Sequence, residues 1–263
     1  DDRVMVLTAE NRGHMRSVPD LLGDRFIDVG IAEQTMIGMA AGLAARGRIV
    51  ITHALAAFLT MRAFEFIRDD VGIPFLPVTM VGMVPGVLSD GNGPTHQAIE
   101  DVALMRGIPG MSVFCPADEE DMIHGFRSIV LSGRPWYMRY TNAPAAVSHT
   151  SVFEPGRAET FLGDPREAEI VILTYGAMFR PCIEAAGRLR SQGRSVCVVN
   201  MRTLAPIDEP LLHVILGGKG AIVTVEDHLP SGGLFSIVAE CMARWGVARP
   251  ILPINLATWF RPA

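Results

Sequence analysis

Short apolar runs alternate along the chain with segments in which apolar residues recur every three or four positions. In the first part of the chain, this pattern predicts strands at 48–55, 75–82 and 136–140 and helices at 33–47 and 118–133. Each of these helices is expected to end at a glycine, Gly47 or Gly133, and the second begins with acidic residues. Strands that alternate with helices favour a parallel sheet, so we expect an α/β fold.

The segment 142–169 interrupts the alternation. It is rich in Pro, Ser, Thr and small residues, and it predicts a linker that leads into a small hairpin-like connection. A second alternation then predicts strands at 169–176, 195–201 and 221–228 and helices at 179–193 and 231–246. We therefore predict two doubly wound α/β domains, over 1–148 and 149–263.

Composition narrows the function classes. The net charge of −5 is spread without long runs, so nothing favours binding to nucleic acid or to an anionic membrane. Hydrophobic residues make up 49% of the chain without forming a transmembrane run, and this indicates burial against another subunit. The N-terminus lacks a secretory signal pattern, and the four cysteines show no metal or redox spacing. We expect a cytoplasmic protein with reduced core thiols.

Glu33 stands among apolar and small residues, in the stretch DVGIAEQTMIGMAAGL at the start of a predicted helix. A glutamate in the first helical turn gains a modest stabilisation from the helix dipole, which would be a purely structural role. Alternatively, the apolar surroundings favour a carboxyl group that keeps its proton and shares it with a ligand nitrogen.

Four stretches, in order, resemble the thiamine-diphosphate-dependent transketolase family. The residues 28–34, DVGIAEQ, resemble its pyrimidine-binding glutamate motif, and 93–101, GPTHQAIED, resemble its substrate-site histidine motif. The residues 115–118, CPAD, resemble a strand-end signature, and 223–240 resemble the C-terminal domain. The resemblance covers nearly the whole chain, and it corresponds to the second half of a full-length transketolase.

The resemblance implies how the cofactor is held. Glu33 would hydrogen-bond a pyrimidine nitrogen of thiamine diphosphate, and Phe58 would stack on the pyrimidine ring, with Ile31 alongside. Arg62 is expected to pair with an acid rather than to touch substrate. The cofactor supplies the carbanion chemistry, so the role of Glu33 is to activate it.

The resemblance also implies contacts with the substrate. His96 would hydrogen-bond the donor carbonyl and the developing alkoxide. Asn92 occupies a position where transketolases usually have an aspartate that contacts a sugar hydroxyl. Arg139 matches a phosphate-facing arginine of the family, or it merely pairs with a carboxylate. Because of Asn92, a phosphorylated ketose is a weaker expectation than the cofactor.

The chain contains no Gly-Asp-Gly, the family motif that holds a divalent metal on the diphosphate. The resemblance therefore implies a partner, an N-terminal transketolase-like subunit that carries this motif and binds Mg²⁺. Two-fold symmetry suggests an α2β2 heterotetramer. The chain would be the C-terminal subunit of a heteromeric enzyme that transfers a two-carbon ketol unit between small-molecule substrates.

Two other classes of function stay open. One is a different enzyme, namely the beta subunit of a 2-oxo-acid dehydrogenase or a decarboxylating carboligase with a pyruvate-like donor. A deoxyxylulose-phosphate-synthase-like activity also belongs to this class, since GIAEQ occurs there too, but the chain lacks that enzyme's first half. The other is a non-catalytic structural or regulatory subunit, against which the joint presence of Glu33, Phe58 and His96 argues.

Overall fold

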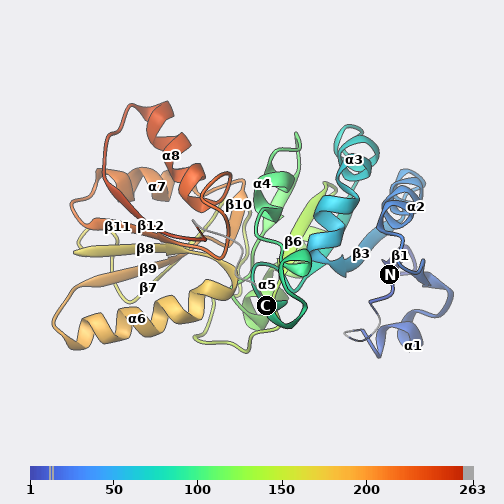
Figure 1. Cartoon of the computed structure of the whole chain (residues 1–263), viewed down its shortest axis with the longest axis horizontal. Helices are drawn as coiled ribbons and strands as arrows, with labels where there is room; N and C mark the ends of the chain where they lie inside the picture. The colour runs from blue at the N-terminus through green and yellow to red at the C-terminus, as the bar shows by residue number, and fades with distance from the viewer. Residues whose placement is uncertain (12, 14, 257–263) are drawn as a thin grey trace. The chain divides into compact units, whose positions relative to one another are not determined.

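The computed structural model describes residues 1–11, 13 and 15–256, and within them the predicted alternation of strands and helices is present (Figure 1). The chain divides into two compact units. Among the described residues, the first consists of Asp1–Val113 and Phe126–Tyr140, and the second of Phe114–Gly125 and 141–256. The predicted domain ranges, 1–148 and 149–263, stay a prediction, and residues 257–263 of the second range lie outside the described part.

The first unit is built on a parallel sheet. Its strands are β1 (Val4–Thr8), β2 (Phe26–Asp28), β3 (Ile49–Leu55), β4 (Val78–Met83), β5 (Ser112–Phe114) and β6 (Trp136–Tyr140). They lie in the order β5-β6-β4-β3-β1-β2, and the pairs β1–β2, β1–β3, β3–β4 and β4–β6 are parallel. Strands buried on both faces explain why 48–55 and 136–140 are almost continuously apolar.

Helical segments connect these strands. They are α1 (Val18–Leu22), α2 (Glu33–Ala45), α3 (Phe64–Phe66), α4 (Asp101–Arg106) and α5 (Glu119–Val130), with short 3₁₀ or π turns at Gly23–Arg25, Phe58–Arg62, Ile67–Gly72, Asp90–Asn92 and Pro94–His96. Helix α2 ends two residues before Gly47, whose φ of +83° permits the turn into β3.

The second unit has its own sheet. The elements of this unit are β7 (Glu159–Phe161), β8 (Ile170–Thr174), a 3₁₀ turn (Gly176–Met178), α6 (Phe179–Ser191), β9 (Val196–Asn200), β10 (Thr203–Ala205), α7 (Glu209–Gly217), β11 (Ala221–Val225), α8 (Leu234–Trp245) and β12 (Ile251–Ile254). Five of the strands form the sheet, in the order β12-β11-β8-β9-β7, and all pairs are parallel except that of β7 with β9. Figure 1 shows α6 on one face of this sheet and α7 and α8 on the other, which is the predicted doubly wound arrangement.

The predicted hairpin-like connection within 142–169 was wrong. Strand β7 pairs antiparallel with β9, with Thr160 opposite Val199, rather than with a neighbour in the chain. The partner follows only after β8 and α6, so no local turn signal marks it. The segment therefore supplies an edge strand to the second sheet.

The core of the second unit lies between α6 and the sheet. Phe179, Cys182 and Ala186, on one face of α6, pack against Val196 and Val198 of β9. All four cysteines are buried and none forms a disulfide, as predicted. Within the described residues, no helix is both long enough and apolar enough to cross a bilayer.

Candidate functional site

The predicted cofactor residues lie on segments that follow the carboxyl ends of three parallel strands. Glu33 follows β2, Phe58 follows β3, and His96 lies between β4 and α4. Ligands of open α/β sheets bind at this edge. Strained backbone is found there too, because Val84, directly after β4, has a φ of +52°, which is unusual for a β-branched residue.

The loop before Glu33 is fixed by Asp28, at the end of β2. Its Oδ1 accepts hydrogen bonds from the backbone N–H groups of Glu10, at 3.0 Å, and Gly30, at 2.9 Å. Gly30 has a φ of +73°, which turns the chain into α2. Glu33 is thereby placed at the first position of the helix with only 2% of its surface exposed. Ile31, in the same loop, is 70% exposed.

Glu33 is paired with an arginine. Nη1 of Arg62 lies 2.7 Å from Oε2 of Glu33, and the Arg62 side chain is 37% exposed. The prediction that Arg62 pairs with an acid is confirmed, and that acid is Glu33. The apolar sequence around Glu33 did not reveal the counter-charge, because Arg62 lies 29 positions further along the chain.

Phe58 and His96 extend this contact into a four-residue cluster. The guanidinium carbon of Arg62 lies 4.4 Å from the centroid of the Phe58 ring. The rings of Phe58 and His96 are 4.9 Å apart in an edge-on arrangement. The structure thus brings together Glu33, Phe58 and His96. These are the residues predicted to activate the cofactor, to stack on its pyrimidine ring and to bind the donor substrate.

Hydrogen bonds fix both the base of the loop that carries His96 and the imidazole ring of His96. Gly86 and Ala98 exchange backbone hydrogen bonds of 2.8 and 3.1 Å, which close the segment between them. His96 Nδ1 lies 3.0 Å from the Thr95 hydroxyl. If that hydroxyl donates, the proton of the imidazole is on Nε2, where it can bond a substrate oxygen.

Asn92 and Arg139 differ in accessibility. Asn92 is exposed, and its side-chain amide donates to Ser89 Oγ at 3.0 Å. Arg139 is only 1% exposed, and its Nε lies 2.9 Å from Asp101 Oδ2, which also accepts from the Tyr137 hydroxyl at 2.7 Å. The pairing with a carboxylate, one of the two roles expected for Arg139, is present. Its contact with a substrate anion stays a prediction.

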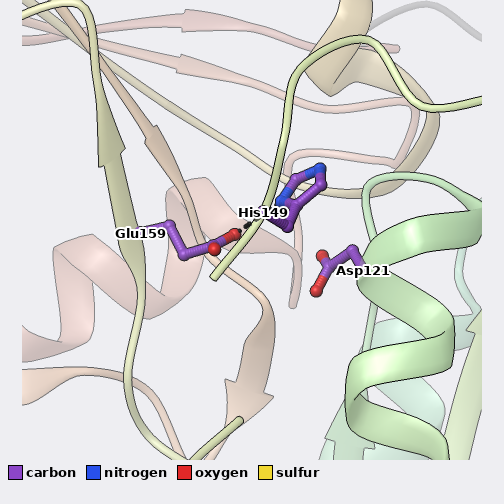
Figure 2. A group of neighbouring side chains, drawn as sticks. All are labelled: Asp121, His149 and Glu159. Atoms are coloured by element: carbon purple, nitrogen blue, oxygen red, sulfur yellow. Dashed lines mark hydrogen bonds and ion pairs between the residues drawn. The ribbon is translucent and has the colours of Figure 1, made fainter. Parts of the chain in front are cut away.

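A second group of polar residues, which the sequence did not reveal, lies inside the second unit. Figure 2 shows Asp121, His149 and Glu159, whose potential ligand atoms lie within 4.8 Å of one another. His149 Nδ1 is 2.7 Å from Glu159, and its Nε2 is 3.0 Å from Asp118. We call Asp118, Asp121, His149, Glu159 and Arg202 the buried carboxylate cluster.

Arg202 and Asn200 complete the hydrogen bonding of this cluster. Arg202 Nε donates to Asp121 at 2.7 Å, and the Asn200 amide donates to both Asp121 and Glu159. Burial alone would lower the pKa of His149, but its bonds to Glu159 and Asp118 and the charge of Asp121 raise the pKa to about 9. Burial opposes ionisation of Glu159 too, yet the His149 bond and Arg202 hold its pKa below the usual range.

These contacts argue against a metal ion at the cluster. Both ring nitrogens of His149 already lie within hydrogen-bond distance of carboxylates, at 2.7 Å from Glu159 and 3.0 Å from Asp118, so a metal ion would have to break one of these contacts. A cation would also have to displace Arg202 from Asp121. The cluster is better explained as an ion-pair network that ties residues 149–159 to α5 and β9.

Comparison with known protein families shows to which family the chain belongs. Residues 2–144 match the family "Transketolase, pyrimidine binding domain", and residues 162–262 match "Transketolase, C-terminal domain". The chain belongs to the transketolase family. The resemblance and the two-domain α/β fold predicted from the sequence are therefore confirmed.

The named relatives include transketolase subunits and 1-deoxy-D-xylulose-5-phosphate synthases. A 6-deoxy-6-sulfo-D-fructose transketolase subunit from Clostridium sp. (strain MSTE9) is 37% identical over 92% of this chain and 76% of its own length. A putative transketolase C-terminal section from Methanocaldococcus jannaschii is 35% identical, with 89% and 73% covered. A 1-deoxy-D-xylulose-5-phosphate synthase from Dictyoglomus turgidum is 35% identical, but the chain spans only 38% of it.

Solved transketolase structures agree with this placement. The chain matches a split gene transketolase, described as an inactive beta4 tetramer, with a TM-score of 0.85 and 34% identity over 98% of this chain and 84% of that one. A Pichia stipitis transketolase, with a TM-score of 0.77 and 21% identity, shares the fold over 97% of this chain and 39% of its own.

The residues at the strand ends suit one end of the cofactor that the transketolase family uses. A carboxyl group buried at a helix start, together with a half-buried aromatic ring, can hold an aminopyrimidine. The Arg62 contact occupies one of the two carboxylate oxygens of Glu33. The specific roles of Glu33, Ile31, Phe58, Asn92, His96 and Arg139 stay predictions.

Proposed function

We propose that the chain is the C-terminal-half subunit of a heteromeric, thiamine-diphosphate-dependent transketolase-like enzyme. The grouping of Glu33, Phe58 and His96 at one sheet edge carries this proposal. Thiamine diphosphate supplies a nucleophilic carbon when it is bound. Glu33 then holds a proton on the pyrimidine nitrogen, Phe58 orients the ring by stacking, and His96 bonds the donor oxygen as negative charge develops.

The proposal of a separate partner rests on the relatives. The chain spans 73% to 84% of the proteins named as a transketolase subunit, a C-terminal section and a split gene transketolase. We infer that an N-terminal transketolase-like polypeptide supplies the Gly-Asp-Gly motif and the Mg²⁺ ligands. Two copies of each chain would form two active sites.

Reconstitution tests the heteromer. The full chain alone should bind thiamine diphosphate with Mg²⁺ weakly in calorimetry, and its complex with the N-terminal polypeptide should bind one cofactor per heterodimer. Tight Mg²⁺-dependent binding to the chain alone would overturn the need for a partner.

The role of Glu33 is tested in the same complex. Glu33→Gln should lower turnover at least 100-fold, because a positioned proton donor contributes about that much. Glu65→Gln, on an exposed residue of α3, is the matched control and should retain activity. Near wild-type turnover of Glu33→Gln would reject the assignment.

The donor class separates two related activities. One relative is named as a 6-deoxy-6-sulfo-D-fructose transketolase subunit, and others are named as 1-deoxy-D-xylulose-5-phosphate synthases. The alternative to ketol transfer is a decarboxylating reaction with a pyruvate-like donor. We infer an anionic ketose donor, cleaved with transfer of a two-carbon unit to an aldehyde. A screen with a ketose phosphate, a sulfonated ketose and pyruvate decides, because release of CO₂ from pyruvate without ketose turnover would establish the alternative.

A further inference from the structure

Arg62 contacts two of the three side chains on which the proposed function depends. Its Nη1 lies 2.7 Å from Oε2 of Glu33, and its guanidinium carbon lies 4.4 Å from the Phe58 ring centroid. Glu33 is 3% exposed in its side chain and Arg62 is 37% exposed, so the guanidinium stands at the rim of the buried carboxylate. Arg62 is thus placed to control what reaches both residues.

The contacts of Arg62 compete with those expected for the cofactor. A carboxylate that accepts from a guanidinium is an acceptor, whereas the proposed contact with the pyrimidine nitrogen needs a carboxyl group that donates. A guanidinium over the Phe58 ring also covers a face that stacking would use. The arrangement in the structure is therefore a closed one for the pyrimidine end.

Arg62 can leave this arrangement without a change in the backbone. Phe58 and Arg62 are the first and last residues of one π-helical turn, a type of distortion that is frequent at functional sites. Because its side chain is partly exposed, water can replace Glu33 as the partner of the guanidinium. A long arginine side chain can swing outward without moving the backbone.

We propose that Arg62 is a latch on the pyrimidine site. It acts as a positioning residue: it holds Glu33 and Phe58 closed in the cofactor-free chain, and it releases both when thiamine diphosphate enters. The latch rests on the proposed function, because it regulates the same site. It neutralises a buried charge while the site is empty, and it makes cofactor binding weaker than the site alone would allow.

The affinity for thiamine diphosphate shows whether Arg62 opposes cofactor binding. In the complex with the N-terminal polypeptide, Arg62→Gln should bind thiamine diphosphate about fivefold more tightly than wild type, since a partly exposed ion pair no longer has to break. Arg62→Lys, which keeps the charge, should stay close to wild type. Arg68→Gln, which alters an exposed arginine paired with Asp69 in the neighbouring turn, is the matched control and should bind as wild type does.

A double-mutant cycle shows whether Arg62 acts through Glu33. In the Glu33→Gln background, Arg62→Gln should no longer tighten binding, because the ion pair is already absent. A general structural role of Arg62 would change affinity equally in both backgrounds. Circular dichroism melting of each variant confirms that the chain is folded.

The outcomes separate the latch from the proposed function. If the wild-type complex binds no thiamine diphosphate, the proposed function is rejected, and the latch with it. If wild type binds and Arg62→Gln binds equally or more weakly, the latch alone is overturned. Tighter binding by Arg62→Gln that disappears in the Glu33→Gln background supports it.

Discussion

Raising the pH through about 9 should remove the charge of His149 and weaken the second unit. The pKa of about 9 in the folded chain exceeds the ordinary value of 6.5, so folding favours the protonated imidazole. The stabilisation is fully present below about pH 6.5 and is lost as the pH rises through 9. Since His149 is 7% exposed, little solvent screening applies, and the difference corresponds to about 3 kcal/mol of unfolding free energy.

Two measurements check this magnitude. The imidazole resonance of His149 in the full chain should titrate near 9 by NMR. In denaturant unfolding at pH 6.5 and pH 10, wild type should lose about 3 kcal/mol more than His149→Gln does. His213→Gln, which replaces an exposed histidine that packs on Trp245, is the control and should behave as wild type. A His149 resonance that titrates near 6.5, or equal losses in wild type and His149→Gln, would refute the reasoning.

Other predictions concern buried pairs and packing. Arg139→Met should lower the unfolding free energy by about 3–5 kcal/mol, because it leaves the buried Asp101 without its guanidinium partner. The control Arg68→Met, which removes an exposed pair, should change the unfolding free energy by less than about 0.5 kcal/mol. Denaturant unfolding measures both changes. Gly82→Ala places a Cβ 2.6 Å from the Tyr137 ring and hydroxyl and should cost about 1–3 kcal/mol, and an unchanged melting temperature would contradict that packing. Zn²⁺ or EDTA at pH 7 should leave the melting temperature unchanged if the buried carboxylate cluster is an ion-pair network; a Zn²⁺-dependent rise would show that it binds metal.

The fold was predictable where periodicity was strong. The apolar runs of β3 and β8 and the helix-ending glycines after α2 and α5 predict the α/β alternations from the sequence alone. Strands β2 and β5 escaped prediction because each has only three residues, too few for a period to show. Strand β12 contains a proline, which is tolerated because it lies at a sheet edge.

The site was predictable only as far as its motifs reach. DVGIAEQ and GPTHQ identified Glu33 and His96, but the pairing of Glu33 with Arg62 depends on how two helical segments pack, which a linear pattern does not encode. The buried carboxylate cluster was missed for the same reason. Its histidine lies in a segment whose composition is that of a linker, and its partners come from positions 118 to 202.

The four buried cysteines allow the opening of the second unit to be detected by their reaction with a thiol reagent. All four belong to the second unit, and burial raises the pKa of Cys182 and of Cys197 to about 11, so that their thiolates are scarce in the closed state. A thiol reagent added to the native protein would therefore react only as fast as that unit opens. The opening rate of one half of the molecule can be followed over time with no engineered label, while the half that carries Glu33 contributes no thiol.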